Sequence, residues 1–369
     1  MSFESYVVKN GKKYRRGYTT GSAAAAAAKA ATLILFNKKR METVKLSTPS
    51  GIELELELEQ IEEKDKFVRV AIIKDAGDDP DVTDGILVYA RVEELSNKGV
   101  VLEGGKGVGK VTKPGLAVKI GEPAINPVPR KMIKNAVKNV LPPGKGVRVT
   151  IEIPEGVEIA KKTFNPKLGI KGGISVLGTS GIVEPMSETA YRESLAIELK
   201  QAVALGEKNV VLVFGNYGKK LANKLGYNIP IIRMSNFVAY MLDESIDLGI
   251  ENIVMIGHIG KIVKVAGGIF NTHSHLTDAR KEIIAAYTAY CGGSQELINK
   301  IFSSNTAEEA ANLLLEADMK KVFNLLAKRV VIRVREHVDN KIDVKSIIFS
   351  MDKGILGTHG IEIEENYNE

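Results

Sequence analysis

Two short apolar runs in the second half of the chain, NVVLVF at 209–214 and NIVMIG at 252–257, each lead into a turn and then a helix-like segment. Continuous runs of this length are typical of strands that are buried on both faces of a parallel sheet. Helical spacing at 187–206 and 235–249 places one predicted helix before each run. The alternation predicts a Rossmann-like parallel α/β domain, in which ligands bind beyond the carboxyl ends of the strands.

The first half of the chain has a different pattern. IELELELEQI at 52–61 alternates apolar and charged residues, as expected of a strand with one face in water, and 67–73 is its expected hairpin partner. Short apolar runs between glycine and proline turns follow, with one helix inside 126–146. The pattern therefore predicts a β-rich α+β fold for this half.

The rhythm of the sequence changes around Phe164. We therefore predict an α+β domain over 1–163 and a Rossmann-like domain over 164–369. Near the end of the chain, RVVIRVREH at 329–337 and VKSIIFSM at 344–351 are expected to be two late strands, which could pair with either domain.

The stretch GYTTGSAAAAAAKAAT at 17–32 contains six consecutive alanines. Alanine is the best helix former, and the Thr-Thr-Gly-Ser run just before it supplies hydroxyls that can cap a helix. We therefore expect a helix to start at Thr20 or Ser22. The run has almost no side-chain bulk, so another backbone or a large flat ligand could approach this helix closely. A packed helix is favoured over a disordered tract, because disordered tracts are rich in proline, glutamate, serine and glutamine.

Composition bounds the class of protein. The 369 residues are 44% hydrophobic and 26% charged, which is typical of a soluble globular chain of about two domains. A single cysteine, Cys291, excludes an internal disulfide and a cysteine-based zinc site, and favours a reducing compartment. The apolar runs are too short to span a bilayer, and no secretory leader is recognisable at the start. We therefore expect a cytoplasmic protein without a membrane partner.

The net charge is +6, from 51 basic and 45 acidic side chains. Apart from 12–16 and 37–40 the basic residues are scattered, and few aromatic residues lie among them. This distribution disfavours nucleic acid as a partner. A polyanionic small molecule and an ordinary solvated surface both remain compatible with it.

The segment GGKGVGKV at 104–111 resembles a phosphate-binding loop. Val111 stands where that motif needs a serine or threonine for magnesium, and no helix follows. We therefore expect a glycine-rich turn or a wall close to substrate instead of a nucleotide site.

Two glycine turns follow the predicted parallel strands. In FGNYG at 214–218, Gly215 and Gly218 would let backbone amides approach a ligand, and Asn216 could bond a polar group. In GHIGK at 257–261, His258 and Lys261 could meet a carboxylate. The alternative for both is an ordinary turn between a strand and a helix.

The loop KDAGDDPDVTDG at 74–85 concentrates five aspartates in a basic chain. Its spacing does not fit a calcium-binding loop. Asp78, Asp79 or Asp81 could act as a general base or orient a proton-bearing group. The alternative is that these aspartates accept hydrogen bonds from turn amides.

NTHSHLTD at 271–278 supplies His273, His275 and Asp278, and His258 lies upstream. Two histidines and one carboxylate can hold a metal ion, so a metal-dependent hydrolase is an alternative function. No H-E-x-x-H pattern supports it, which favours hydrogen bonding or substrate contact over a metal.

Several strings occur together and in one order between about residues 15 and 280: RRGYTTGSAAAAAAKAA, KDAGDDPDVTDG, GVGKVTKPGLAVKIGEPAINPVPRKMI, FNPKLGIKGGISVLGTSGIVEPMSE, FGNYG, SNFVAYML and GHIGKIVKVAGGIFNTHS. They resemble the CbiD family, the cobalt-precorrin-5B C-1 methyltransferases of the anaerobic cobalamin pathway. This chain has Ser22 and Ala23 where the family commonly reads Thr-Cys, so no thiol chemistry can depend on that place. It has Asp84 where the family often has histidine.

The resemblance implies transfer of a methyl group from S-adenosylmethionine to ring carbon 1 of a carboxylate-rimmed tetrapyrrole. Cobalt would enter only as part of the substrate, and the protein itself would hold no metal. Neighbouring corrin-pathway enzymes are conceivable partners, and a non-catalytic corrinoid-binding protein is a further alternative. The predicted site residues are Asp78, Asp79, Asp81 and His258 for catalysis; Gly215, Asn216, Tyr217, Gly218, Thr179, Ser180 and Gly181 for the cofactor; and Thr19, Thr20, Gly21, Ser22, Lys261 and His273 for the substrate.

Overall fold

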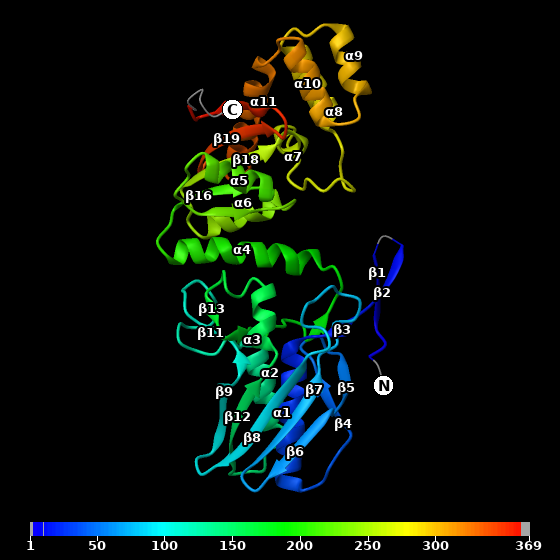
Figure 1. The fold of residues 1–369 in the computed structure, drawn as a ribbon, viewed down its shortest axis with the longest axis vertical. Helices are drawn as coiled ribbons and strands as arrows, with labels where there is room; N and C mark the ends of the chain where they lie inside the picture. Colours follow the sequence, from blue (N-terminus) through cyan, green and yellow to red (C-terminus); the bar gives the residue numbers. More distant parts are fainter. Residues whose placement is uncertain (1–2, 10, 363–369) are drawn as a thin grey trace. The chain divides into compact units, whose positions relative to one another are not determined.

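The computed structural model describes residues 3–9 and 11–362, and the chain divides into two compact units, 1–188 and 189–369 (Figure 1). A mixed α/β fold that includes parallel strands is confirmed. The boundary lies later than the predicted 163/164, because short strands after Phe164 pair with the first unit. These are β13 (Ile170–Lys171) with β11 (Lys110–Val111), β14 (Gly173–Ile174) with β10 (Gly107–Val108), and β15 (Ile182–Val183) with β3 (Gly17–Tyr18).

The first unit is built on a five-stranded sheet with the order β6-β7-β8-β12-β9. The strands are β6 (Gln60–Lys64), β7 (Phe67–Ile73), β8 (Leu87–Leu95), β12 (Gly146–Glu152) and β9 (Gly99–Gly104), all antiparallel to their neighbours except the β12–β9 pair. Smaller elements complete the unit: the β1 (Tyr6–Lys9) and β2 (Lys12–Arg15) pair, the β4 (Thr43–Ser47) and β5 (Glu53–Glu57) pair, α3 (Gly156–Ile159) and a 3-10 turn at Ala160–Lys162.

The predicted strand at 52–61 is two strands. Its first part, β5, pairs with β4, and its second part begins β6, which forms the predicted hairpin with β7. The change of partner occurs at Leu58 and Glu59, where the backbone N–H of Leu58 donates to Glu42 and that of Glu59 donates to Ala71. Alternation alone could not reveal this change, because the side-chain pattern continues through it.

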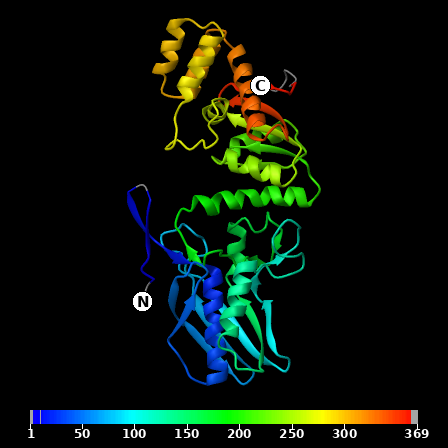
Figure 2. The same cartoon turned by 180° about the vertical axis from the view of Figure 1, so that it is seen from behind.

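The alanine run lies in helix α1 (Thr20–Asn37), beside helix α2 (Pro127–Lys138) (Figure 2). Thr19 is the N-cap, and its side chain accepts from the backbone N–H of Ser22. Ala23–Ala28 are fully buried against α2 and the sheet strands β7 and β8. The expected close approach by backbone is therefore confirmed, and the alternative of a flat ligand lying on this alanine surface is wrong because the chain itself covers it.

The second unit contains a sheet with the order β17-β16-β18-β19-β20. Its strands are β16 (Asn209–Val213), β17 (Ile231–Arg233), β18 (Asn252–His258), β19 (Asp343–Ser350) and β20 (Gly354–His359); the first four in space are parallel, and β20 is antiparallel. Helix α5 (Asn216–Lys224) packs on one face, where Ala222 meets Val211 and Val213. The other face is covered by α4 (Glu188–Ala204), α6 (Val238–Asp247), α7 (Ile259–Ala266) and α11 (Lys321–His337). Helices α8 (Arg280–Tyr290), α9 (Gln295–Ser303) and α10 (Ala307–Glu316) join the same core by packing on α7, on α11 and on one another.

The predicted strand at 329–337 is wrong, because this segment is the last part of helix α11. Val330, Val331 and Val334 are buried at helical spacing in the core of the second unit. Valine and isoleucine favour strands only weakly, and packing overrides that preference here. The other predicted late strand, 344–351, corresponds to β19, which pairs with β18 of the same unit. No helix in the described part of the chain is both long enough and apolar enough to cross a membrane.

Candidate functional site

The carboxyl edge of the parallel sheet contains a topological switch point. β16 and β18 are neighbours, yet the chain leaves β16 through α5 on one face and reaches β18 through α6 on the other. Loops at such a point diverge and leave a crevice in which α/β proteins bind ligands. Both predicted glycine turns, 214–218 and 257–261, lie at this edge, because each directly follows one of the two strands.

The turn after β16 presents open backbone. Gly215 precedes α5, and a β-carbon added to it would meet no atom within 4 Å. Asn216 is exposed, and the Tyr217 side chain is also exposed. Gly218 has a different role, because a β-carbon there would lie 3.1 Å from Cβ of Val213. Three of the four predicted cofactor residues in this turn can therefore face a ligand, whereas Gly218 serves packing.

Asn236 links three segments at the same edge. Its side-chain oxygen accepts from Lys261 Nζ at 2.8 Å and from the Thr272 hydroxyl at 3.3 Å. Its carbonyl oxygen accepts from the backbone N–H of Thr272 at 3.1 Å. Burial, with a smaller contribution from Lys264, lowers the pKa of Lys261. Sequence analysis missed Asn236; its position just after the short strand β17 was the available signal.

Lys264 is a second residue that sequence analysis missed. Its side chain is only 2% exposed, and Nζ donates to the carbonyl oxygens of Thr272 at 3.2 Å and Thr277 at 2.6 Å. Burial, followed by repulsion from Arg280, lowers its pKa. The lysine therefore holds the loop 271–278 against α7.

His258 is the N-cap of α7. Its Nδ1 accepts from the backbone N–H of Gly260 at 3.1 Å, and its Nε2 lies 2.6 Å from Oε1 of Glu308 on α10. Burial raises the pKa of Glu308, but hydrogen bonds from Met351 N–H, His258 and Ser350 outweigh it and the pKa is lowered. Since Nδ1 is an acceptor here, the proton is on Nε2, and both ring nitrogens are engaged. The arrangement positions the start of α7; the predicted catalytic role of His258 stays a prediction.

The metal-dependent alternative finds no support in residues 3–9 and 11–362, where no group of three histidine, cysteine or acidic side chains could hold an ion. His273 and His275 stack on each other with ring centroids 5.3 Å apart. Asp278 forms a two-point ion pair with Arg280 at 2.6 and 2.7 Å. These side chains are therefore engaged separately from the His258–Glu308 pair.

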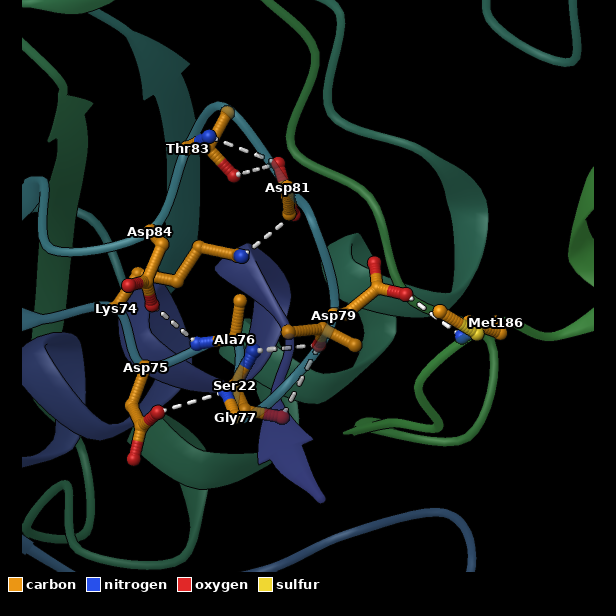
Figure 3. A network of polar contacts seen from close by, with 11 residues as sticks. Ser22, Lys74, Asp75, Ala76, Gly77, Asp79, Asp81, Thr83, Asp84 and Met186 are labelled. Carbon is orange, nitrogen blue, oxygen red and sulfur yellow. Dashed lines mark hydrogen bonds and ion pairs between the residues drawn. The ribbon is translucent and has the colours of Figure 1, made fainter. Parts of the chain in front are cut away.

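The aspartate loop 74–85 lies in the first unit and is tied together by its own side chains (Figure 3). Lys74 is 2% exposed and forms an ion pair with Asp81 at 2.6 Å, while Asp81 also accepts from the backbone and hydroxyl of Thr83. Burial raises the pKa of Asp81, but Lys74 and the bonds from Thr83 outweigh it and the pKa is lowered. Asp81 therefore supports the loop as an ionised carboxylate.

Asp78 and Asp79 connect this loop to other parts of the first unit. Asp78 accepts from the backbone N–H of Arg15 at 2.5 Å, and Asp79 accepts from that of Met186 at 2.9 Å, as Figure 3 shows for the latter. Asp75 also binds the Arg15 guanidinium through both oxygens. Catalytic roles for Asp78, Asp79 and Asp81 stay predictions.

The start of α1 brings two predicted sets together. The Ser22 hydroxyl donates to the Gly181 carbonyl at 2.6 Å, and Thr19 N–H donates to the same oxygen at 3.1 Å. The Gly21 N–H donates to Leu177 at 2.9 Å, and Thr20 is buried. The loop containing Thr179, Ser180 and Gly181 thus contacts the same helix start that was predicted to bind the substrate. The substrate and cofactor roles of these residues stay predictions, and the predicted cofactor residues are divided between the two units.

Comparisons with known proteins identify the family. The CbiD model matches residues 7–185, and the CbiD C-terminal domain model matches 271–360. The chain is 49% identical to a protein named cobalt-precorrin-5B C(1)-methyltransferase from Thermoanaerobacter sp. (strain X514), over 98% of this chain and 100% of that protein. The chain belongs to the CbiD family.

Two further CbiD relatives are similar. A protein with the same printed name from Alkaliphilus metalliredigens (strain QYMF) is 49% identical over 96% of this chain and 94% of its own length. The crystal structure of a cobalamin biosynthesis protein (cbiD) from Archaeoglobus fulgidus is 32% identical, with a TM-score of 0.38, and covers 75% of this chain and 87% of its own.

In this CbiD protein the two matched segments flank the switch point. The turns at 214–218 and 257–261 fall between residue 185, where the first match ends, and residue 271, where the second begins. The second match starts at Asn271 and so includes the loop that Lys264 holds. Sheet topology, and not a match to a family model, is therefore what singles out this edge as a candidate site.

Proposed function

We infer that this CbiD protein catalyses the reaction for which its relatives are named, the methylation of cobalt-precorrin-5B at ring carbon 1 in cobalamin biosynthesis, with S-adenosylmethionine as the methyl donor. The observation that carries the inference is the 49% identity to a protein of that name over that protein's full length. Cobalt enters this reaction as part of the substrate. Cytoplasmic location and contact with neighbouring corrin-pathway enzymes stay predictions.

We place the cofactor in the crevice at the switch point of the second unit, which we interpret as Rossmann-like. The residues there fit S-adenosylmethionine. Gly215 leaves space for close approach to the backbone, and the first turn of α5 offers amides to an anionic or polar group. The Lys261 ammonium, held by Asn236, suits the carboxylate of the methionine part. Asn216 and Tyr217 complete this edge.

When bound, S-adenosylmethionine supplies a methyl group that is already activated by its sulfonium. The protein therefore mainly has to align the methyl carbon with the ring carbon and exclude water. Fixed loops serve that purpose: Lys264 holds the loop 271–278, and His258 with Glu308 fixes the start of α7. Asp78 or Asp79 in the first unit remains our candidate for orienting a proton-bearing group of the substrate.

The test is an anaerobic incubation of the purified protein with S-adenosylmethionine and the cobalt-precorrin-5 pool, followed by mass spectrometry of the tetrapyrrole. We expect the mass of one added methyl group, and none without protein or without the methyl donor. Loss of the signal in a folded Gly215→Val variant would locate the cofactor site. A tetrapyrrole that stays unmethylated with folded wild-type protein would overturn the function.

A further inference from the structure

Four glycines of the first unit form a crossing at which backbones touch; we refer to Gly107, Gly109, Gly156 and Gly173 as the glycine crossing. A β-carbon on Gly107 would lie 1.7 Å from the Ile153 carbonyl oxygen, and one on Gly173 would lie 2.1 Å from the Gly107 oxygen. The added carbons on Gly156 and Gly109 would likewise lie 2.3 Å from neighbouring atoms. The glycine-rich segment 104–111 therefore allows close backbone packing. This agrees with the expectation that the segment is a turn and not a nucleotide-binding loop.

The glycine crossing fixes how β11 and β13 meet. Val111 pairs with Ile170, and both side chains are buried in a small core with Val118 and Ala124. Lys110 pairs with Lys171 in the same antiparallel register, and both are exposed. Side chains directly opposite each other have Cβ atoms about 4.5–5.5 Å apart, and like charges in that position are destabilising. The strand register thus places two lysine side chains directly opposite each other.

Nothing in the described chain neutralises this pair. Neither Lys110 nor Lys171 has a carboxylate within ion-pair distance in residues 3–9 and 11–362. Glu122 is the acidic residue whose backbone adjoins β11, since its carbonyl accepts from Val111 N–H at 3.0 Å, but its carboxylate pairs with Arg130 at 3.3 Å. Two more exposed lysines extend the same segments, Lys113 and Lys167, the first donating to the carbonyl of the second at 3.5 Å.

We propose that Lys110 and Lys171 form a binding site for a carboxylate of the tetrapyrrole substrate. A carboxylate placed between the two ammonium groups turns their repulsion into two attractions. Lys113 and Lys167 would add positive potential for the neighbouring acid groups of the same rim. The proposal rests on the proposed function for the identity of the ligand, and its location rests on the strand register.

The first test compares two double variants that remove the same charge. Lys110→Gln with Lys171→Gln removes the proposed site. Lys39→Gln with Lys66→Gln is the control, on two exposed lysines after the end of α1 and in the β6–β7 turn, neither of which has an ion pair within the described residues. We expect the KM for the tetrapyrrole to rise about tenfold in the first variant only, since each exposed ion pair adds only a few-fold to affinity. The Kd for S-adenosylmethionine should not change in either.

A third variant separates binding from folding. Lys171→Glu places an acid opposite Lys110, so the cross-strand repulsion becomes an ion pair and the Tm should stay the same or rise. The KM for the tetrapyrrole should nevertheless rise at least as much as in the double variant. A KM within twofold of wild type in both site variants, or an equal rise in the control, would overturn the proposal.

A direct binding measurement keeps this proposal distinct from the proposed function. The probe is uroporphyrin III, a tetrapyrrole rimmed with carboxylates, titrated at low and high salt. Weaker binding and a shallower salt dependence in the double variant would support the lysine pair, even if wild-type protein transferred no methyl group and the proposed function failed. If wild type and the double variant bound uroporphyrin III equally, and the double variant lost retention only on an RNA column, the lysine pair would be assigned to nucleic acid and the proposal would be overturned.

Discussion

His258 Nε2 lies 2.6 Å from Oε1 of Glu308, and this contact joins the carboxyl end of β18 to α10. The same Glu308 oxygen accepts from the backbone N–H of Met351 at 2.7 Å, just after β19. One carboxylate thus connects the ends of two parallel strands, at the edge where we place the cofactor.

Glu308 should make stability depend on acid pH. Its pKa is lowered in the folded protein, so its contribution is present above the unfolded value of about 4.3 and is lost as pH falls through the folded value. Glu308→Gln should therefore be less stable than wild type in urea unfolding at pH 7, and the difference should shrink on acidification below about pH 4. A difference that stayed constant between pH 7 and pH 3 would contradict the lowered pKa.

We expect Asp81 to stabilise the fold and not to take part in catalysis. Asp81→Asn leaves the buried Lys74 ammonium without its counter-charge and should cost about 2 kcal/mol, less than the about 3–5 kcal/mol of a fully buried pair because Asp81 is partly exposed. Val82→Ala, on an exposed side chain in the same loop, should change stability by less than about 0.5 kcal/mol. Chemical denaturation measures both. A stable but inactive Asp81→Asn protein would instead favour the catalytic role.

Gly215 should tolerate a side chain without loss of stability. Its backbone is extended, with φ at −171°, and the added atoms meet open space, so Gly215→Val should keep the wild-type Tm. The same atoms would obstruct the proposed cofactor site, and we expect the Kd for S-adenosylmethionine, measured by calorimetry, to rise at least about tenfold. Gly218→Ala is the counterpart: its β-carbon crowds Val213, so it should lower the Tm more than Gly215→Val does. If Gly215→Val bound S-adenosylmethionine as tightly as wild type, the cofactor site would have to lie elsewhere.

Lys264 should control the order of the loop 271–278. Lys264→Met keeps the length of the side chain but leaves the carbonyls of Thr272 and Thr277 without their donor, at a cost of about 1–3 kcal/mol. We expect faster amide hydrogen exchange in this loop. Lys300→Met removes an exposed lysine paired with Glu296 on α9 and should leave the exchange rates of 271–278 unchanged. If amide exchange in the loop were equally slow in wild type and Lys264→Met, the loop would be ordered without the hydrogen bonds from Lys264.

The parts of the fold that depend on local sequence features could be predicted from the sequence. The strands 209–213 and 252–258, their glycine turns and the alanine helix follow from apolar runs, turn residues and helix propensity. The helix at 329–337 could not be predicted in this way, because its valines satisfy both a strand alternation and a buried helical stripe, and only the core of the second unit selects between them.

The candidate site could be predicted only in part. Its glycine turns are visible in the sequence because each follows a strand. Asn236 and Lys264 gain their roles from contacts with Thr272 and Thr277, which depend on how the chain returns to the sheet edge. For the aspartates of 74–85, the sequence allowed both a catalytic role and hydrogen bonding to turn amides; the structure shows their bonds to Lys74, Arg15 and turn amides, and a catalytic role stays a prediction.

The small alanine side chains of α1 allow the neighbouring layers to pack very close to this helix. With methyl groups alone on Ala23–Ala28, the sheet and α2 approach the helix as closely as side chains permit. Each added methylene would have to push a neighbouring layer outward, so this surface should accept exchange to serine or glycine far more readily than to leucine or valine. The spacing between α1, α2 and the sheet is therefore set by alanine, the smallest side chain that still favours a helix. The packing there leaves no room for larger side chains.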